Sequence, residues 1–317
     1  MTRVVPVSFT NRDGVRLAGV IEEPMEGPTR PQAVVLLSPG VKTRIAPHGL
    51  YRKLAAVLTR LGFRVLRFDF YGLGDSEGTV TETSKRELYA SIQVGRYVGD
   101  TAAALDWMQQ TYGTSTFIVG GLCGGAITGV LAAPSDPRVV GILGLGLPVT
   151  LDAPGVDSTR FMSVGQLKGV RGRYLRKILD PKSWLRVLRL QTDFRLLFKA
   201  LTVRHAPVRP PAASPTAADD SNPLLFPNFL KLLQRGCRVQ LVFSEVDRLT
   251  SDYEEKFRMR HEAALAPFAD LLDVRVIPSA NHVLTLAEWQ RLWFDFAASW
   301  CEQHFPAPRR AESARSE

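Results

Sequence analysis

The chain has 317 residues, of which 45% are hydrophobic and 22% are charged. These values are ordinary for a globular protein with a sizeable core, so they exclude fibrous and wholly disordered classes. The net charge of +9 is concentrated in residues 150–235, which hold 15 lysines and arginines against 6 acidic residues. A charge confined to one segment is weak support for nucleic-acid binding, which we do not expect.

Membrane insertion, export and metal binding are not expected either. The longest apolar stretch, residues 139–149, is interrupted by glycines and falls short of the roughly 20 residues of a membrane-spanning helix. The first residues lack the apolar core of a signal peptide, so we expect a cytoplasmic location. The three cysteines, Cys123, Cys237 and Cys301, are far apart, which predicts reduced thiols and neither disulfides nor a metal site. No cofactor is expected.

The predicted elements begin with a hairpin and continue as alternating strands and helices. Residues 4–9 and 15–21 alternate in polarity around an Asn-Arg-Asp-Gly turn, which predicts a β-hairpin. Short apolar runs, each followed by a turn and by helical periodicity, then predict parallel strands joined by crossover helices. These strands are expected at residues 33–37, 63–68, 116–119, 139–145, 238–243 and 272–277. The helices are expected at residues 48–61, within 87–110, at 124–133 and from about 286 to 302.

The alternation is interrupted after the sixth strand. Residues 151–235 are predicted to form a helical, basic insertion, and its Pro/Ala-rich stretch, residues 206–223, is too poor in apolar residues to pack and is predicted to be mobile. The insertion lies near the carboxyl ends of the strands, where open α/β sheets bind ligands, so we interpret it as a lid. Residues 1–150 and 236–305 would form the core and residues 306–317 a disordered tail.

Arginines and leucines are interspersed within the insertion, between residues 173 and 190. This pattern fits a cationic lid face that packs on the core through its leucines. It also fits a surface for an anionic substrate, or a peripheral contact with anionic lipid. These interpretations stay open at this point.

The most informative segment is an apolar strand that runs into Gly121-Leu-Cys123-Gly-Gly125 and then into a helix of small residues. This is the nucleophile-elbow pattern with cysteine in the serine position. The turn is so tight that side chains two residues to either side would collide with backbone, and the glycines avoid that collision. Because the helix N-terminus favours the thiolate, Cys123 is the predicted nucleophile. Cys237 and Cys301 are interpreted as buried apolar residues.

The partners of a nucleophilic cysteine can also be placed. Gly124 would donate one backbone N–H to an oxyanion, and Val41, in the loop after residues 33–37, the other. His282, in the loop after the last strand, is the expected base, and Asp247, after the preceding strand, is the acid expected to orient it. The other four histidines are interpreted as surface or capping residues, His48 least clearly.

Four further carboxylates also have to be assigned a role. Glu245 and Asp152 are alternatives to Asp247 as the acid, because each follows a predicted strand of the same sheet. Asp69 and Asp75 lie in the glycine-rich segment 67–78. We interpret them as structural hydrogen-bonding residues of a compact loop.

With these residues assembled, the chain resembles the α/β-hydrolase superfamily. The resemblance implies an α/β-hydrolase fold, with a mostly parallel eight-stranded sheet, helices on both faces and a helical lid after the sixth strand. More narrowly, the chain looks like the exosortase-associated hydrolases, which are linked to bacterial polysaccharide export. The similar features are a glycine-containing loop followed by Arg44 and His48, the LRFDFYGLGDSEG segment, the GLCGGA elbow and the long basic insertion. This implies a substrate-binding role for Gly40, Arg44 and His48.

The resemblance is incomplete at one position. Gly124 stands where an acidic residue is expected in the exosortase-associated family. The dienelactone-hydrolase group shares the cysteine nucleophile but is generally smaller and lacks so long an insertion, so it is the weaker analogy.

A thiolate nucleophile limits the chemistry. Esters, lactones and thioesters are favoured over peptides, because an amine leaves less readily than a thiolate from the tetrahedral intermediate. We therefore expect a small-molecule acyl substrate, with anionic acyl compounds as one option. Acyl transfer with the same catalytic triad of Cys123, His282 and Asp247, and an inactive binding protein of the same fold, remain alternatives.

Overall fold

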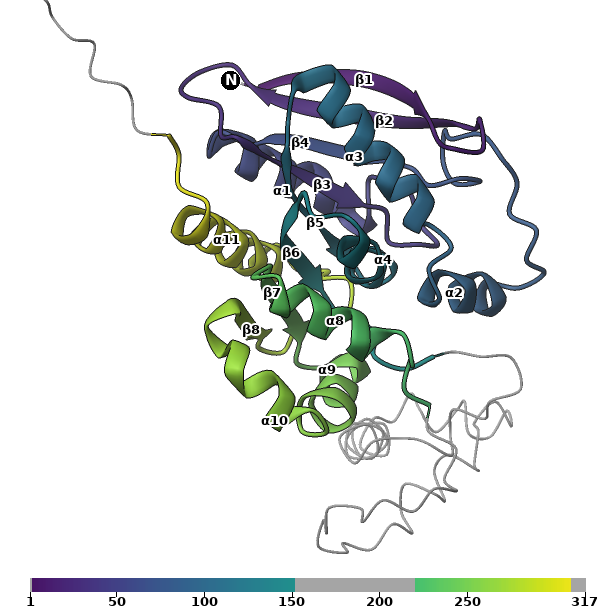
Figure 1. The fold of residues 1–317 in the computed structure, drawn as a ribbon, viewed down its shortest axis with the longest axis vertical. Helices are drawn as coiled ribbons and strands as arrows, with labels where there is room; N and C mark the ends of the chain where they lie inside the picture. Colours follow the sequence, from purple (N-terminus) through teal and green to yellow (C-terminus); the bar gives the residue numbers. More distant parts are fainter. Residues whose placement is uncertain (1, 152–219, 309–317) are drawn as a thin grey trace, which may run out of the picture.

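The computed structural model describes residues 2–151 and 220–308. They build one sheet in the order β1-β2-β4-β3-β5-β6-β7-β8, with the β1–β2 hairpin at one end and β8 at the other (Figure 1). β2 pairs antiparallel with β1 and with β4, and the other neighbours are parallel. The strands are β1 (Thr2–Thr10), β2 (Arg16–Pro24), β3 (Gln32–Leu37), β4 (Arg64–Phe68), β5 (Thr116–Leu122), β6 (Val139–Leu145), β7 (Arg238–Ser244) and β8 (Leu272–Ile277). The predicted mostly parallel, eight-stranded sheet is confirmed.

The N-terminal hairpin is closed by Asn11. Its Oδ1 accepts hydrogen bonds from the backbone N–H groups of Asp13 and Val15, both at 3.0 Å. Its Nδ2 donates to Asp100 Oδ1 at 2.8 Å in a buried contact. Gly14 completes the turn with φ +77°, a conformation that favours glycine.

Helices cover both faces of the sheet (Figure 1). One face packs against α2 (Lys85–Gln93), α3 (Val98–Tyr112), α4 (Gly124–Ala132) and α8 (Leu225–Gln234), and the other against α1 (Leu50–Arg60) and α11 (Ala287–His304). The shorter elements are 3-10 helices at Pro47–Gly49, Ala133–Ser135 and Ala266–Leu271, α9 (Arg248–Asp252), a π-helical turn at Tyr253–Arg258 and α10 (Glu262–Leu265). None of the helices in the two described segments is both long and apolar enough to cross a membrane.

The sequence pattern explains these layers. In β3, residues 33–37 are all buried, as expected of a parallel strand covered on both faces. In α1, Leu50, Leu54 and Leu58 recur every fourth residue and are fully buried, so the helix presents one apolar stripe to the sheet. In α11, Trp293 and Trp300 are buried at helical spacing in the same layer.

Most of the predicted lid, residues 152–219, lies outside the described residues, as do the basic segment and most of the Pro/Ala-rich stretch. The last residues of that stretch are described and contact the core. Ser221 forms a bridge with Thr150, and Asn222 is buried with its Nδ2 donating to the carbonyl of Gln93 at 2.7 Å.

The helix α8 also differs from the prediction, which placed it in the insertion. Phe229, Leu232 and Leu233 are buried in the same core cluster as the apolar residues of α4. The helix is therefore the crossover between β6 and β7. The boundary predicted at residue 236 lies too late, because α8 belongs to the core.

The parallel strands end along one edge of the sheet, and four of the loops that follow carry the predicted site. Val41 follows β3, Cys123 follows β5, Asp247 follows β7 and His282 follows β8. Parallel pairing makes these loops neighbours, which is how an open α/β sheet gathers residues distant in sequence.

Candidate active site

Cys123 occupies the turn between β5 and α4 with φ 55° and ψ −105°. A positive φ is unfavourable for a residue with a side chain and stores strain. The turn is held by Cys123 N–H, which donates to the carbonyl of Leu145 at 2.8 Å. A Cβ at Gly121 or Gly125 would lie 2.5 or 2.3 Å from the carbonyl oxygen of Leu37. The predicted need for two glycines thus has a structural cause, which is the close approach of the end of β3.

A buried tyrosine braces the same turn. Tyr51 donates from its hydroxyl to the carbonyl of Leu37 at 2.8 Å. The hydroxyl oxygen of Tyr51 in turn accepts a hydrogen bond from the backbone N–H of Leu122 at 2.6 Å. Burial raises the pKa of Tyr51 well above its ordinary value. The hydroxyl is therefore a permanent structural link between the ends of β3 and β5.

The loop that follows β3 lies against the start of α4 beside the elbow. Gly40 has φ +87°, and an ideal Cβ on it would lie 3.5 Å from the Cα of Gly124. Conversely, a Cβ on Gly124 would lie 2.8 Å from the carbonyl oxygen of Pro39 and 3.0 Å from the Cα of Gly40. Neither Val41 N–H nor Gly124 N–H donates to any residue in the described ranges. This arrangement can receive an oxyanion.

The imidazole and the carboxylate are in direct contact. His282 Nδ1 lies 2.5 Å from Asp247 Oδ2, and the two side chains are 37% and 10% exposed. Asp247 is also the N-cap of α9, where Oδ1 accepts from the N–H of Leu249 at 3.3 Å. The cap fixes the carboxylate. Cys123 lies near enough to the ring to raise the pKa of His282.

The electrostatics of His282 favour the charged ring. Burial alone would lower its pKa, but the hydrogen bonds and charges of Asp247 and Cys123 outweigh it and raise the pKa to about 10. The imidazole is then an imidazolium at neutral pH. Gly146 lies beneath the ring, since a Cβ there would be 3.6 Å from the His282 Cε1 and Nδ1 atoms.

Glu245, an alternative acid, has another role. Its Oε2 accepts from the backbone N–H of Ser279 at 2.6 Å, which holds the start of the histidine loop. Ser279 and Leu284, on either side of His282, both have positive φ, so this loop is tightly specified. The other alternative, Asp152, lies outside the described residues.

Tyr89 is a site residue that the sequence did not reveal. Its hydroxyl oxygen lies 2.7 Å from Cys123 Sγ. It comes from α2, within a stretch predicted only as helical in part. Nothing in its neighbourhood marks it, because a tyrosine on an amphipathic helix has no motif of its own.

Arg44 and His48 were both predicted to bind substrate, and their surroundings in the structure differ from each other. Arg44 pairs with the fully buried Asp69 and, at 2.6 Å, with Asp75. Its backbone N–H donates to Asp69 Oδ1 at 2.6 Å. The guanidinium is thus committed to the loop carboxylates, as the structural interpretation of Asp69 and Asp75 implies. His48 is exposed and makes no side-chain hydrogen bond to any described residue.

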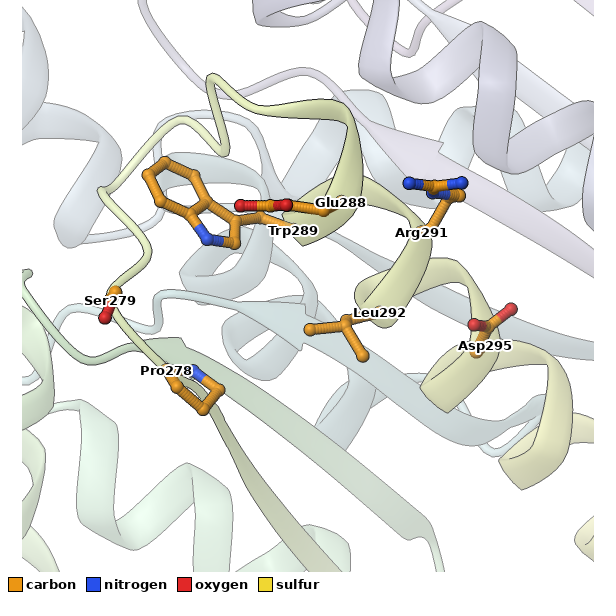
Figure 2. Close-up of a pocket in the computed structure, with 7 residues that line it drawn as sticks. All are labelled: Pro278, Ser279, Glu288, Trp289, Arg291, Leu292 and Asp295. Atoms are coloured by element: carbon orange, nitrogen blue, oxygen red, sulfur yellow. The ribbon is translucent and has the colours of Figure 1, made fainter.

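A surface depression of about 640 Å³ lies between the loop that leaves β8 and the start of α11 (Figure 2). It combines apolar and charged side chains, among them Pro278, Trp289, Leu292, Glu288, Arg291 and Asp295. None of the three triad residues lines it. Elsewhere, residues 2–151 and 220–308 contain no group of three or more His, Cys, Asp or Glu side chains that could hold a metal ion.

Comparison with known proteins identifies the fold. Residues 29–177 match the family model described as serine aminopeptidase, S33 (Hydrolase_4). Over 96% of this chain, the structure is similar to the Pyrococcus furiosus esterase Pf2001, with 17% identity, 92% of that chain covered and a TM-score of 0.56. It is likewise similar to the α/β serine hydrolase XC6422 of Xanthomonas campestris, which lacks a lid, with 13% identity, 96% and 97% coverage and a TM-score of 0.52.

The third structure is the α/β hydrolase GrgF of a Penicillium species, with 14% identity, 96% and 99% coverage and a TM-score of 0.56. No curated protein matches the sequence. The chain therefore has the α/β-hydrolase fold, as predicted. Where the XC6422 structure is described as a serine hydrolase, this chain carries a cysteine at the elbow, Cys123.

Proposed function

We propose that the protein is a hydrolase that cleaves an ester or a thioester through an acyl-enzyme on Cys123. The observation that carries the proposal is the grouping of Cys123, His282 and Asp247 at one edge of the sheet. Cys123 occupies a strained elbow and raises the pKa of His282, whose Nδ1 lies 2.5 Å from Asp247 Oδ2. Nucleophile, proton carrier and orienting acid are thus in the order that acyl transfer needs.

The first half-reaction follows from the charges. The Cys123 thiolate attacks the acyl carbon, and the S–C bond forms as the carbonyl oxygen becomes an oxyanion. The N–H groups of Val41 and Gly124 receive that charge. The bond to the leaving group then breaks, and the leaving oxygen or sulfur takes the proton of the His282 imidazolium. The products are an acyl-thioester on Cys123 and a neutral imidazole.

The second half-reaction restores the enzyme. The neutral His282 accepts a proton from water as that water attacks the acyl-thioester. The tetrahedral intermediate expels the Cys123 thiolate and releases the carboxylic acid. Asp247 holds the ring in one orientation throughout and stabilises the imidazolium that reforms.

The substrate class follows from the leaving group. A thiolate competes well with an amine as leaving group, so amides tend to collapse back to reactants, whereas esters and thioesters proceed. The proposed substrate is therefore a small acyl ester or thioester. The same acyl-enzyme could be intercepted by an alcohol, which would make the protein an acyltransferase.

The test is intact-protein mass spectrometry after brief exposure to p-nitrophenyl acetate and to short acyl-thioesters. Cys123→Ala is compared with Cys237→Ala, because burial raises the pKa of Cys237 to about 12 and keeps that thiol unreactive. We expect an acyl adduct in the wild type and in Cys237→Ala, none in Cys123→Ala, and little in His282→Ala.

The fate of the adduct separates the functions. Decay to free acid in water supports hydrolysis, whereas faster decay with an added alcohol and an ester product would point to acyl transfer. The proposal fails if the wild type forms no adduct and turns over neither substrate class. A binding protein that kept the fold without the chemistry would behave in that way.

A further inference from the structure

We infer that Tyr89 is a catalytic residue whose O–H donates a hydrogen bond to the Cys123 thiolate. The inference deepens the proposed function and rests on it. The carrying observation is the 2.7 Å separation between the Tyr89 hydroxyl oxygen and Cys123 Sγ. The hydroxyl comes from α2, a different part of the fold from the loop after β8 that carries His282.

The position of the proton follows from ordinary acidities. A free phenol has a pKa of about 10 and a free thiol a pKa of about 8.5. Between two such groups in contact, the thiol gives up its proton first, and the phenol keeps its own. The hydroxyl is then the donor and the sulfur the acceptor, and a hydrogen bond to an anion is stronger than one to a neutral sulfur.

The N-terminal end of α2 is firmly capped, which gives the hydroxyl a defined place. Ser84 is the N-cap and accepts from the N–H of Glu87 at 3.1 Å. The Glu87 carboxylate in turn accepts from the N–H of Thr83 at 2.9 Å. Leu88 and Ile92, one turn apart, are buried in the core cluster. Since the apolar stripe fixes the rotation of the helix, Tyr89 is held in its place beside them.

The C-terminal end of α2 is also fixed. Gln93 Nε2 donates to the carbonyl of Thr150 at 2.7 Å. The Gln93 carbonyl accepts from Asn222 Nδ2 at 2.7 Å, and both side chains are buried. Tyr89 lies one helical turn before this clamp. The contact with Cys123 is therefore made by a helix fixed at both ends, and it does not depend on a loose side chain.

The consequence concerns how the reactivity of Cys123 changes when the hydroxyl is removed. A hydrogen bond that favours the thiolate over the thiol lowers the pH at which the thiolate forms. A shift of one pH unit changes the thiolate fraction tenfold wherever the thiol predominates. Loss of the hydroxyl should therefore slow attack by Cys123 at low pH and leave it unimpaired at high pH.

The experiment is the rate of Cys123 alkylation by iodoacetamide as a function of pH, in wild type and Tyr89→Phe. We expect the midpoint of the profile to move up by about one pH unit, with alkylation about tenfold slower below the midpoint and equal or faster above it. Tyr112→Phe is the matched control, because Tyr112 loses the same hydroxyl at the far end of α3. Its profile should overlay that of the wild type.

A purely structural role for Tyr89 would give a different result. It would depress the rate equally at every pH, and that outcome, or profiles that overlay, would overturn the inference. Tyr89→Met, which fills space without a hydroxyl, is the second variant should Tyr89→Phe fold poorly, and it should show the same shift.

Alkylation needs no substrate, so this test separates the two proposals. A shifted alkylation profile in a protein that forms no acyl adduct would overturn the hydrolase proposal and support the hydrogen bond. Adduct formation with overlaid alkylation profiles would support the hydrolase proposal and overturn the role of Tyr89.

Discussion

Substitution of Gly124 by alanine tests the proposed oxyanion site directly. Gly124 is the first residue of α4, and an added Cβ would lie 2.8 Å from the carbonyl oxygen of Pro39 and 3.0 Å from the Cα of Gly40. Both contacts are with backbone, so either the loop or the helix start must move by roughly half an ångström to reach van der Waals separation. That movement separates the N–H of Val41 from the N–H of Gly124.

The magnitude follows from the loss of one aligned donor. Removing an oxyanion donor typically lowers kcat by about 10²- to 10³-fold, so we expect acylation by p-nitrophenyl acetate to slow by a factor in or somewhat below that range. Alkylation of Cys123 by iodoacetamide should be unchanged, because it forms no oxyanion. We expect little change in the free energy of unfolding, because alanine is favoured over glycine in a helix by about 1 kcal/mol and this gain offsets the strain of the new contacts.

Gly129→Ala is the control, because it is the same substitution in the same helix and its nearest contact is 3.5 Å from Val119. It should leave both rates unchanged. Gly124→Ala with wild-type acylation and wild-type stability would refute the reasoning, since the oxyanion would then be stabilised elsewhere. Loss of both acylation and alkylation would also refute it, because the elbow itself would have been disturbed.

Three further outcomes are expected. The rate of hydrolysis of an alkyl ester should fall as the pH rises through about 10, because His282 then loses the proton that it gives to the leaving group. The rate for a thioester should fall less, because a leaving thiolate needs that proton less. Equal pH profiles for the two substrates would contradict this reasoning. Asp247→Asn removes a charge that raises the pKa of His282, so the fall in the rate of ester hydrolysis should move to lower pH. The rate of acylation should also drop by about 10²- to 10⁴-fold. Glu245→Gln is the control. Arg44→Ala leaves Asp69 buried without its cation, so it should lower the free energy of unfolding, measured in urea, by about 3 kcal/mol. The KM should not change. A raised KM with an unchanged free energy of unfolding would instead support Arg44 as a substrate-binding residue.

The fold could be predicted because its signals are local. The parallel strands β3, β4, β5, β6 and β7 are short runs that are buried on both faces, and this burial leaves an apolar signal in the sequence. The elbow could be predicted for a related reason. Its glycines are imposed by the backbone at Leu37, and that steric demand leaves a fixed spacing around Cys123 in the sequence.

The parts that were missed depend on contacts between distant segments. Arg44 forms ion pairs with Asp69 and Asp75, whereas the sequence shows only an arginine near a predicted binding loop. Tyr89 reaches Cys123 across 34 residues of chain, with no spacing rule to link them. The helix α8 was assigned to the insertion because the predicted alternation resumes only at residue 238. Its packing against α4 depends on a tertiary contact that the sequence does not show.

A cysteine suits the electrostatics of this site better than a serine. With a pKa of about 10, His282 is charged at neutral pH, and an imidazolium cannot remove the proton of a serine hydroxyl. It can neutralise a thiolate and protonate a leaving group. Cys123→Ser would remove both contributions that Cys123 makes to the raised pKa of His282, so the pKa of the ring would fall and only Asp247 would keep raising it. The serine variant would also have to lose its hydroxyl proton during attack, whereas the proposed wild-type pair starts as a thiolate beside an imidazolium, so we expect Cys123→Ser to be acylated more slowly than the wild type at neutral pH.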